Sequence, residues 1–200
     1  MSLFLEVIGP PPELLIVGAG HIAVPLAKIG KVLDFEVTVL DDRPAFARRE
    51  RFPEADRVIV GWIDDVLRQY PVGPGTHLVL VTRGHKLDEA ALKIVIDKGA
   101  SYLGMIGSQR RVREVFRNLR EFGIAEELIR RVHAPIGLEI RAETPAEIAL
   151  AIAAEIVRVR RGGPADPQSM RERVWRSSAG ETSVPSGPRT ATGPEKAAGR

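Results

Sequence analysis

The chain contains no cysteine and no long hydrophobic run. The lack of cysteine excludes disulfides, thiolate metal sites and cysteine nucleophiles, and it favours a reducing compartment. No apolar run reaches the roughly 18 residues that a membrane-spanning helix needs, and the first residues lack a basic region followed by an apolar stretch. We therefore expect a cytoplasmic protein that does not interact with membranes.

The first 160 residues also lack an excess of either charge. The chain contains 29 Lys and Arg, of which seven lie in residues 161–200, and 26 Asp and Glu, of which four lie there. Residues 1–160 therefore contain equal numbers of basic and acidic residues. Nucleic-acid binding would require a basic surface on the folded part, and none is expected. The tail is rich in Gly, Pro, Ser and Thr, so it cannot bury enough surface to offset its ordering entropy. We predict one folded domain over residues 1–162 and a disordered basic tail over 163–200.

Residues 13–23 combine a buried strand, a glycine turn and the start of a helix. In this pattern Gly18 permits a tight turn, and Gly20 lets the backbone approach a phosphate. Free N–H groups of the first helical turn and the helix dipole favour an anion at the same place. The pattern predicts a nucleotide-binding turn, with a turn that serves only packing as the alternative. The candidate binding residues are Gly18, Ala19, Gly20, His21 and Ile22.

Strands alternate with helices along the rest of the domain. This alternation predicts an α/β fold, namely a Rossmann-like doubly wound parallel sheet in a single domain. Strands are expected at 14–17, 35–40, 57–60, 76–82, 102–106 and 132–134, and helices at 21–33, 63–70, 86–98 and 125–130, after Ser108 and after Thr144.

Two acidic residues, Asp41 and Asp42, end the second expected strand. Ligands of such sheets bind beyond the carboxyl ends of the strands, and an acid about 20 residues after the glycine turn commonly accepts hydrogen bonds from the ribose. The adjacent Arg43 can instead pair with a 2′-phosphate, so NAD and NADP both stay open. The alternative is a solvated turn before Pro44.

Thr82, Arg83, Gly84 and His85 follow the fourth expected strand and are candidates for ligand contact. Gly84 is typical of a close approach of the backbone to a ligand. For His85 the alternative is an ordinary surface residue. No catalytic residue and no metal-ligand set is predicted.

A second candidate anion site comprises Gly107, Ser108, Arg110 and Arg111. Arginines occupy the opening turns of the helix that follows, where the dipole disfavours positive charge. An anionic ligand group at the free N–H groups would compensate for this cost. The alternative is a solvated face with Glu114 as partner.

Six motifs, in order over about residues 10–160, resemble the XdhC/CoxI family. They are Leu-Ile-Val-Gly-Ala-Gly-His-Ile-Ala at 15–23, Val-Leu-Asp-Asp-Arg-Pro-Ala-Phe-Ala at 39–47, Thr-Arg-Gly-His at 82–85, Tyr-Leu-Gly-Met-Ile-Gly-Ser at 102–108, His-Ala-Pro-Ile-Gly-Leu at 133–138 and Glu-Thr-Pro-Ala-Glu-Ile-Ala at 143–149. The resemblance implies an accessory protein for the maturation of a molybdenum hydroxylase such as xanthine dehydrogenase or carbon monoxide dehydrogenase. Such proteins bind the molybdenum cofactor, shield it during sulfuration and transfer it to the apo-enzyme.

The ligand that the resemblance implies is NAD(P) or the molybdenum cofactor, whose dinucleotide form has a pyrophosphate suited to the turn at Gly18–Gly20. The implied partner is the apo-enzyme of a molybdenum hydroxylase. A cysteine desulfurase and a second copy of the chain, in a homodimer, are further candidates. Family members commonly carry an N-terminal domain before the Rossmann half, so a separate N-terminal XdhC-type domain is expected as well.

Two positions depart from the family pattern: Gln109 stands where a basic residue is common, and Arg141 where glycine is common. Two other functions stay open beside cofactor delivery. One is an NAD(P)-dependent oxidoreductase, although neither a Tyr-x-x-x-Lys motif nor a His–carboxylate pair is evident in the sequence. The other is a domain that binds NAD(H) as a sensor.

Overall fold

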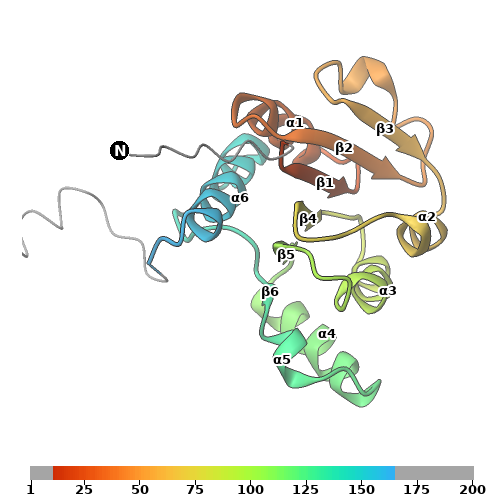
Figure 1. The fold of residues 1–200 in the computed structure, drawn as a ribbon, viewed down its shortest axis with the longest axis vertical. Coiled ribbons are helices and arrows are strands. Elements are labelled where there is room, and N and C mark those ends of the chain that lie inside the picture. Colours follow the sequence, from red (N-terminus) through yellow and green to blue (C-terminus); the bar gives the residue numbers. More distant parts are fainter. Residues whose placement is uncertain (1–10, 165–200) are drawn as a thin grey trace, which may run out of the picture. The chain divides into compact units, whose positions relative to one another are not determined.

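A computed structural model of the chain describes residues 11–164. These residues form a six-stranded parallel sheet in the order β3-β2-β1-β4-β5-β6 (Figure 1). The order reverses between β1 and β4, which is the switch point of a doubly wound sheet. The predicted Rossmann-like α/β fold is confirmed, whereas the tail predicted over 163–200 lies almost wholly outside the described residues. The strands are β1 (Glu13–Val17), β2 (Glu36–Asp41), β3 (Arg57–Val60), β4 (Thr76–Leu80), β5 (Tyr102–Met105) and β6 (Val132–His133).

Helices cover both faces of the sheet. Two of them, α1 and α6, lie together on one side of the sheet, and α2 and α3 lie on the other (Figure 1). None of the helices in the described part is long and apolar enough to cross a bilayer. The helices are α1 (Ala23–Val32), α2 (Ile63–Gln69), α3 (His85–Val95), α4 (Gln109–Glu121), α5 (Glu126–Ile129) and α6 (Pro145–Arg160), with a short 3-10 helix, η1 (Arg49–Arg51), before β3.

The continuous apolar runs of the central strands follow from this two-sided cover. In β1, Leu14 and Ile16 belong to the core on the side of α1 and α6. Their neighbours Leu15 and Val17 belong to the opposite core, with the buried side chains of α2, α3 and α4. Because successive strand residues point to opposite faces, both sets must be apolar.

Helix α6 begins at the residues that the sequence predicts. The Thr144 hydroxyl accepts a hydrogen bond from Glu147 N at 3.3 Å, and Glu147 Oε2 accepts one from Thr144 N at 2.9 Å. This reciprocal capping box satisfies two N–H groups that would otherwise lack partners, and Pro145 at the first helical position needs none. The capping box therefore fixes where α6 begins, and hence which of its residues face the core.

A buried carboxylate, Glu155, connects α6 to the last two strands. Its Oε2 accepts hydrogen bonds from the Tyr102 hydroxyl at 2.6 Å and from Gly137 N at 2.9 Å. Its Oε1 lies 3.4 Å from His133 Nδ1, and the His133 ring stacks on Tyr102. This His–carboxylate pair is not evident in the sequence because its members lie on different elements. Burial opposes the ionisation of Glu155, but the contacts with His133, Tyr102 and Gly137 N outweigh it and lower its pKa to about 2.

We predict that Glu155→Gln lowers the free energy of unfolding at pH 7. A carboxyl whose pKa is depressed in the folded state stabilises the fold above its unfolded pKa, near 4.5, and loses this contribution as the pH falls through about 2. The difference between the variant and the parent should therefore be largest at neutral pH and shrink below about pH 4.5. Urea denaturation at pH 7 and pH 3 measures both values. A difference that is the same at the two pH values would show that the charge of Glu155 contributes nothing.

Candidate functional site

The turn between β1 and α1 lies at the centre of the carboxyl edge of the sheet. At Gly18 the backbone has a φ of 108°, and a Cβ would lie 2.5 Å from the carbonyl oxygen of Val81. Gly18 is therefore required by the fold itself. At Gly20, by contrast, a Cβ would meet no atom within 4 Å. Among the other predicted turn residues Ala19 is buried, His21 is exposed, and Ile22 packs partly against the core.

Asp41, the last residue of β2, holds this turn in place. Its Oδ2 accepts a hydrogen bond from Ala19 N at 2.7 Å and one from Arg43 Nη2 at 2.8 Å. Its Oδ1 accepts from the backbone N and Nε of Arg43, at 2.9 and 2.8 Å. Burial of the residue, which is only 2% exposed, opposes ionisation, but the Arg43 and Ala19 hydrogen bonds prevail and lower the pKa of Asp41 to about 2. Both carboxylate oxygens of Asp41 thus already accept hydrogen bonds from the protein. The contact of Asp41 with a ribose stays a prediction.

The second acid, Asp42, connects the two sides of the crevice. Its carboxylate accepts hydrogen bonds from Arg83 Nη1 and Nη2 at 2.7 and 2.9 Å. Arg83 belongs to the segment after β4, so this bidentate pair joins the carboxyl ends of strands on either side of the glycine turn. The structure therefore brings together three of the predicted regions: the glycine turn, the acids at the end of β2 and the segment after β4.

The segment after β4 is fixed by Thr82. Its hydroxyl donates to Asp88 Oδ1 at 2.7 Å and accepts from Gly84 N at 3.3 Å. A Cβ at Gly84 would meet no atom within 4 Å, as at Gly20. His85 begins α3, and its side chain lies outside the described part of the structure.

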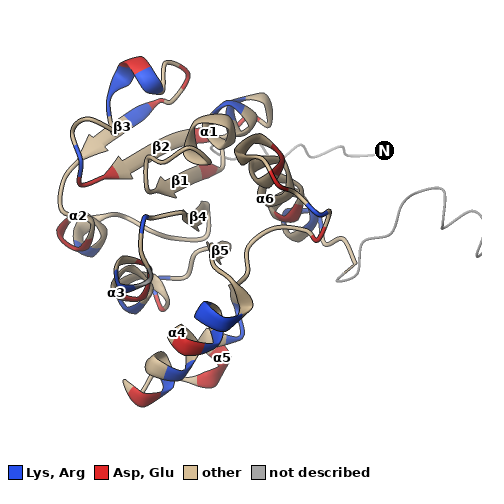
Figure 2. Ribbon diagram, turned by 180° about the vertical axis from the view of Figure 1, so that it is seen from behind, with Lys and Arg blue, Asp and Glu red and all other residues tan. Residues whose placement is uncertain are grey.

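The second candidate anion site is only partly assembled. Ser108 caps α4 by accepting a hydrogen bond from Arg111 N at 3.4 Å. The side chain of Arg111 folds back over Gly107, whose Cβ would lie 3.5 Å from Arg111 Cδ. Arg110 instead joins Arg113 and other side chains of α4 around an open hollow of about 530 Å³. The two arginines therefore lie on different sides of α4, which carries many of the basic residues (Figure 2).

Two residues beside the crevice were not predicted from the sequence. Arg51 Nη1 donates to the carbonyl oxygen of Ala19 at 2.8 Å and to that of Phe46 at 3.0 Å, so a cation lies against the glycine turn. Trp62 is 74% exposed directly after β3, and its neighbour Gly61 donates from N to the carbonyl oxygen of Asp41 at 3.2 Å. Four arginines within residues 43–51 were a signal for the first. Trp62 had none, since an exposed indole cannot be distinguished from a buried one by sequence alone.

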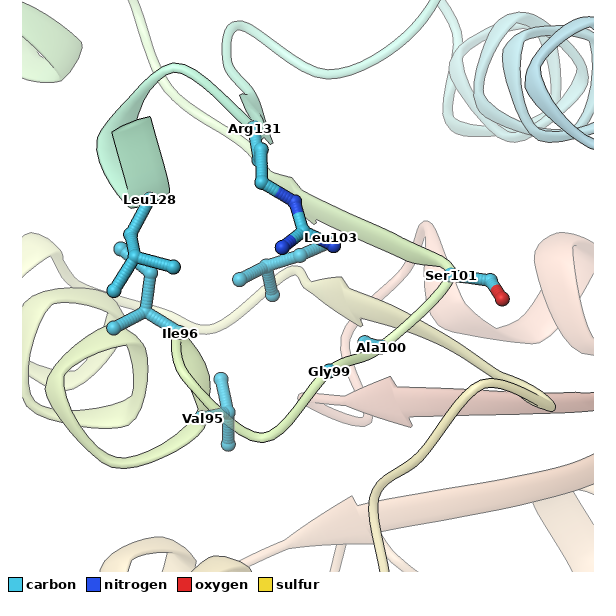
Figure 3. A pocket seen from close by; sticks show the side chains of 8 residues that line it. All are labelled: Val95, Ile96, Gly99, Ala100, Ser101, Leu103, Leu128 and Arg131. Carbon is cyan, nitrogen blue, oxygen red and sulfur yellow. The ribbon is translucent and has the colours of Figure 1, made fainter. Parts of the chain in front are cut away.

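One small cavity lies away from the carboxyl edge of the sheet. Figure 3 shows a cavity of about 40 Å³ beside Gly99 and Ser101, at the amino end of β5, with the Arg131 side chain extending toward Leu103. It has room for water but not for a nucleotide. In the described residues, no group of three or more His, Asp or Glu is arranged to bind a metal ion.

The strand order and the glycine turn at the switch point define a Rossmann domain. The model of the family described as the XdhC Rossmann domain matches residues 14–156, and the chain belongs to this family. The backbone at Arg141 has a φ of 57°, in the left-handed region that glycine occupies without strain, so the structure explains why glycine suits this position and gives no reason for arginine.

Named relatives agree with this assignment. The chain is 34% identical to the uncharacterized protein YqeB of Escherichia coli K12 over 165 residues, which cover 82% of this chain and 30% of YqeB. It is 30% identical to a probable xanthine dehydrogenase subunit of Bacillus subtilis over 160 residues, 80% of this chain and 46% of the relative. A crystal structure of a xanthine dehydrogenase from Bacillus halodurans superposes with a TM-score of 0.69 at 28% identity, over 82% of this chain and 46% of that one. The chain spans less than half the length of these relatives.

We predict that Asp41→Ala and Asp42→Ala differ in their effect on stability. Removing Asp41 leaves the buried Ala19 N–H without its acceptor, which should cost about 1–3 kcal/mol. The Asp42 side chain is also buried, at 8% exposed, but its removal leaves only Arg83, which is 47% exposed and can be solvated, so the loss should be smaller than that for Asp41. Urea denaturation of both variants at pH 7 gives the two values. Equal losses would contradict the assignment of Asp41 as the residue that holds the turn.

Proposed function

We propose that the domain binds a nucleotide-containing cofactor in the crevice at the carboxyl edge and takes part in the maturation of a molybdenum hydroxylase. The ligand is NAD(P) or the molybdenum cofactor, including its dinucleotide form. The phosphates of the ligand lie at the Gly18–Gly20 turn, next to the first turn of α1. The names of two relatives, which refer to xanthine dehydrogenase, support the second half of the proposal.

The contrast between the two glycines carries the proposal. The fold itself requires glycine at position 18, since the positive φ and the closeness of Val81 exclude a side chain. The fold does not require glycine at position 20, because an added Cβ would point into open space beside the N-terminus of α1. A glycine that the fold does not require, in a turn directed at a helix N-terminus, fits a backbone that must lie close to a phosphate.

The surroundings of Asp41 suit the adenosine half of the ligand. The Arg51 guanidinium is fixed beside Ala19 through Nη1. Its Nη2 and Nε form no hydrogen bond within the described residues, so they can donate to a phosphate oxygen. The exposed Trp62 offers an aromatic face on which a base can stack.

The proposed partner is the apo-enzyme of a molybdenum hydroxylase. The longer relatives contain a further half that this sequence does not match. A separate N-terminal XdhC-type domain, with a cysteine desulfurase, would supply the remaining steps of delivery and sulfuration. Mass spectrometry of the ligand released from protein purified from its own host identifies the cofactor.

We expect Gly20→Val to weaken nucleotide binding while the fold survives. The added side chain would occupy the space of a phosphate and displace its contacts with the backbone, so the Kd should rise about tenfold or more. Gly75→Val is the matched control, because a Cβ there also meets no atom within 4 Å but lies at the amino edge. Calorimetry with ADP and NAD(P) measures the Kd, and thermal unfolding monitors the fold. Parental affinity in folded Gly20→Val would disprove the proposed site.

The variants Arg111→Gln and Arg110→Gln test whether the two sides of α4 contribute differently to ligand affinity. If the start of α4 contacts a second anionic group, only Arg111, which folds over Gly107, should matter. Its replacement should then weaken binding of a dinucleotide by about 1–2 kcal/mol, with a smaller loss at high salt. Arg110→Gln, on the outer side with Arg113, should leave the affinity unchanged. Titration of both variants at two salt concentrations tests this difference, and equal effects would contradict it.

A further inference from the structure

The carboxylate of Asp41 has no acceptor position left for a ligand. A carboxylate offers about four such positions, divided between its two oxygens. Protein donors fill all of them: Ala19 N and Arg43 Nη2 bind Oδ2, and the backbone N and Nε of Arg43 bind Oδ1. The side chain of Asp41 is also only 3% exposed. A ribose hydroxyl can therefore bind Asp41 only in place of one of these donors.

The guanidinium of Arg43 is fixed in place but keeps one free edge. Its Nε and Nη2 each donate to Asp41 at 2.8 Å, and its central carbon lies 3.8 Å from the centroid of the Phe46 ring. Its Nη1 forms no hydrogen bond within residues 11–164, and the side chain is 28% exposed. Because the group is already held by an ion pair and a cation–π contact, it loses little rotamer freedom when an anion binds to the free edge.

Three arginines and two carboxylates meet at this end of the crevice. Asp41 pairs with Arg43, and Asp42 pairs with Arg83. Arg51 hydrogen-bonds to two backbone carbonyl oxygens and has no carboxylate partner in the described part of the chain. Both acids are thus compensated, and one positive charge is left over. Such a surplus attracts a further anionic group and does not favour a neutral hydroxyl.

The fold determines which part of a nucleotide reaches the free edge of Arg43. When the phosphates lie at the glycine turn of a doubly wound sheet, the end of the second strand faces the 2′ position of the adenosine ribose. An acid at this place accepts a hydrogen bond from a 2′-hydroxyl, whereas an arginine accommodates a 2′-phosphate. In this chain the acid is saturated by protein donors, and the arginine is open to a ligand. The arrangement therefore favours the phosphate.

We propose that the crevice selects an adenine nucleotide with a phosphate on the ribose 2′ oxygen, and that Arg43 recognises this phosphate through its free edge. The inference rests on the proposed function, because it requires the rest of the nucleotide at the Gly18–Gly20 turn. Of the two nicotinamide dinucleotides it selects NADP(H). A free 2′-hydroxyl gains little at the same place, since Asp41 has no acceptor position for its proton.

Probes that differ only at the ribose test this selection in the parent protein. NAD and NADP differ by the 2′-phosphate alone, and adenosine 2′,5′-bisphosphate and 3′,5′-bisphosphate carry equal charge at different positions. By calorimetry we expect NADP to bind about tenfold more tightly than NAD, and the 2′,5′ isomer about tenfold more tightly than the 3′,5′ isomer. Both ratios should shrink at high salt. Equal affinities for the two isomers would show attraction of charge without recognition of the 2′ position, and would overturn the proposal.

Arg43→Gln tests the residue itself. The change removes the cation and frees acceptor positions on Asp41, so the Kd of NADP should rise about tenfold, and NAD should bind no more weakly than to the parent. Arg68→Gln is the matched control, because Arg68 is exposed in the last turn of α2 and its carbonyl oxygen accepts from Lys98 Nζ, before the amino end of β5. This control removes the same charge far from the crevice and should change neither value.

The possible outcomes separate this inference from the proposed function. If Arg43→Gln keeps the parental ratio of the two Kd values, Arg43 does not recognise the phosphate and the proposal is wrong. If the parent binds NAD as tightly as NADP, the selection is absent, although nucleotide binding at the turn stands. If the parent binds none of the four probes, nucleotide binding fails, and this inference fails with it. The comparison of the isomers in the parent does not depend on the folding of any variant.

Discussion

The hydrogen bond from Ala19 N to the Asp41 carboxylate is the interaction on which the crevice depends. It joins the turn after β1 to the end of β2 inside the buried part of the sheet. The turn can approach β4 closely only because residue 18 is glycine, and it keeps this position because Asp41 holds the next residue. A carboxylate that accepts a buried backbone N–H and pairs with Arg43 is costly to leave without partners, so the arrangement is rigid.

This rigidity determines the electrostatics of the edge. Asp41 and Asp42, the two acids nearest the turn, are each paired with an arginine, Arg43 and Arg83. Their negative charges are therefore compensated within the protein. A phosphate bound at the turn, as proposed, would lie near the guanidinium of Arg51 without an unpaired carboxylate beside it. An unpaired acid at this place would repel the phosphate, so the ion pairs and the proposed anion site are compatible.

The β6 end of the sheet is stiffened by a different buried carboxylate. Glu155 connects β5, α6 and the segment after β6 through Tyr102 and Gly137 N. The two carboxylates, Asp41 and Glu155, thus hold the centre and the β6 end of the sheet in position.

Local patterns in the sequence were sufficient for the fold. The apolar runs of β1 and β4, the capping box at Thr144 and the glycine turn depend on neighbours within a few residues, and they predicted the parallel sheet and the centre of the crevice. Contacts between distant segments decided the rest: the pairing of Asp42 with Arg83, the placement of Arg51 on Ala19 and the exposure of Trp62. Spacing along the chain says nothing about such contacts, because they exist only once the strands are ordered and the segments beyond their ends lie side by side.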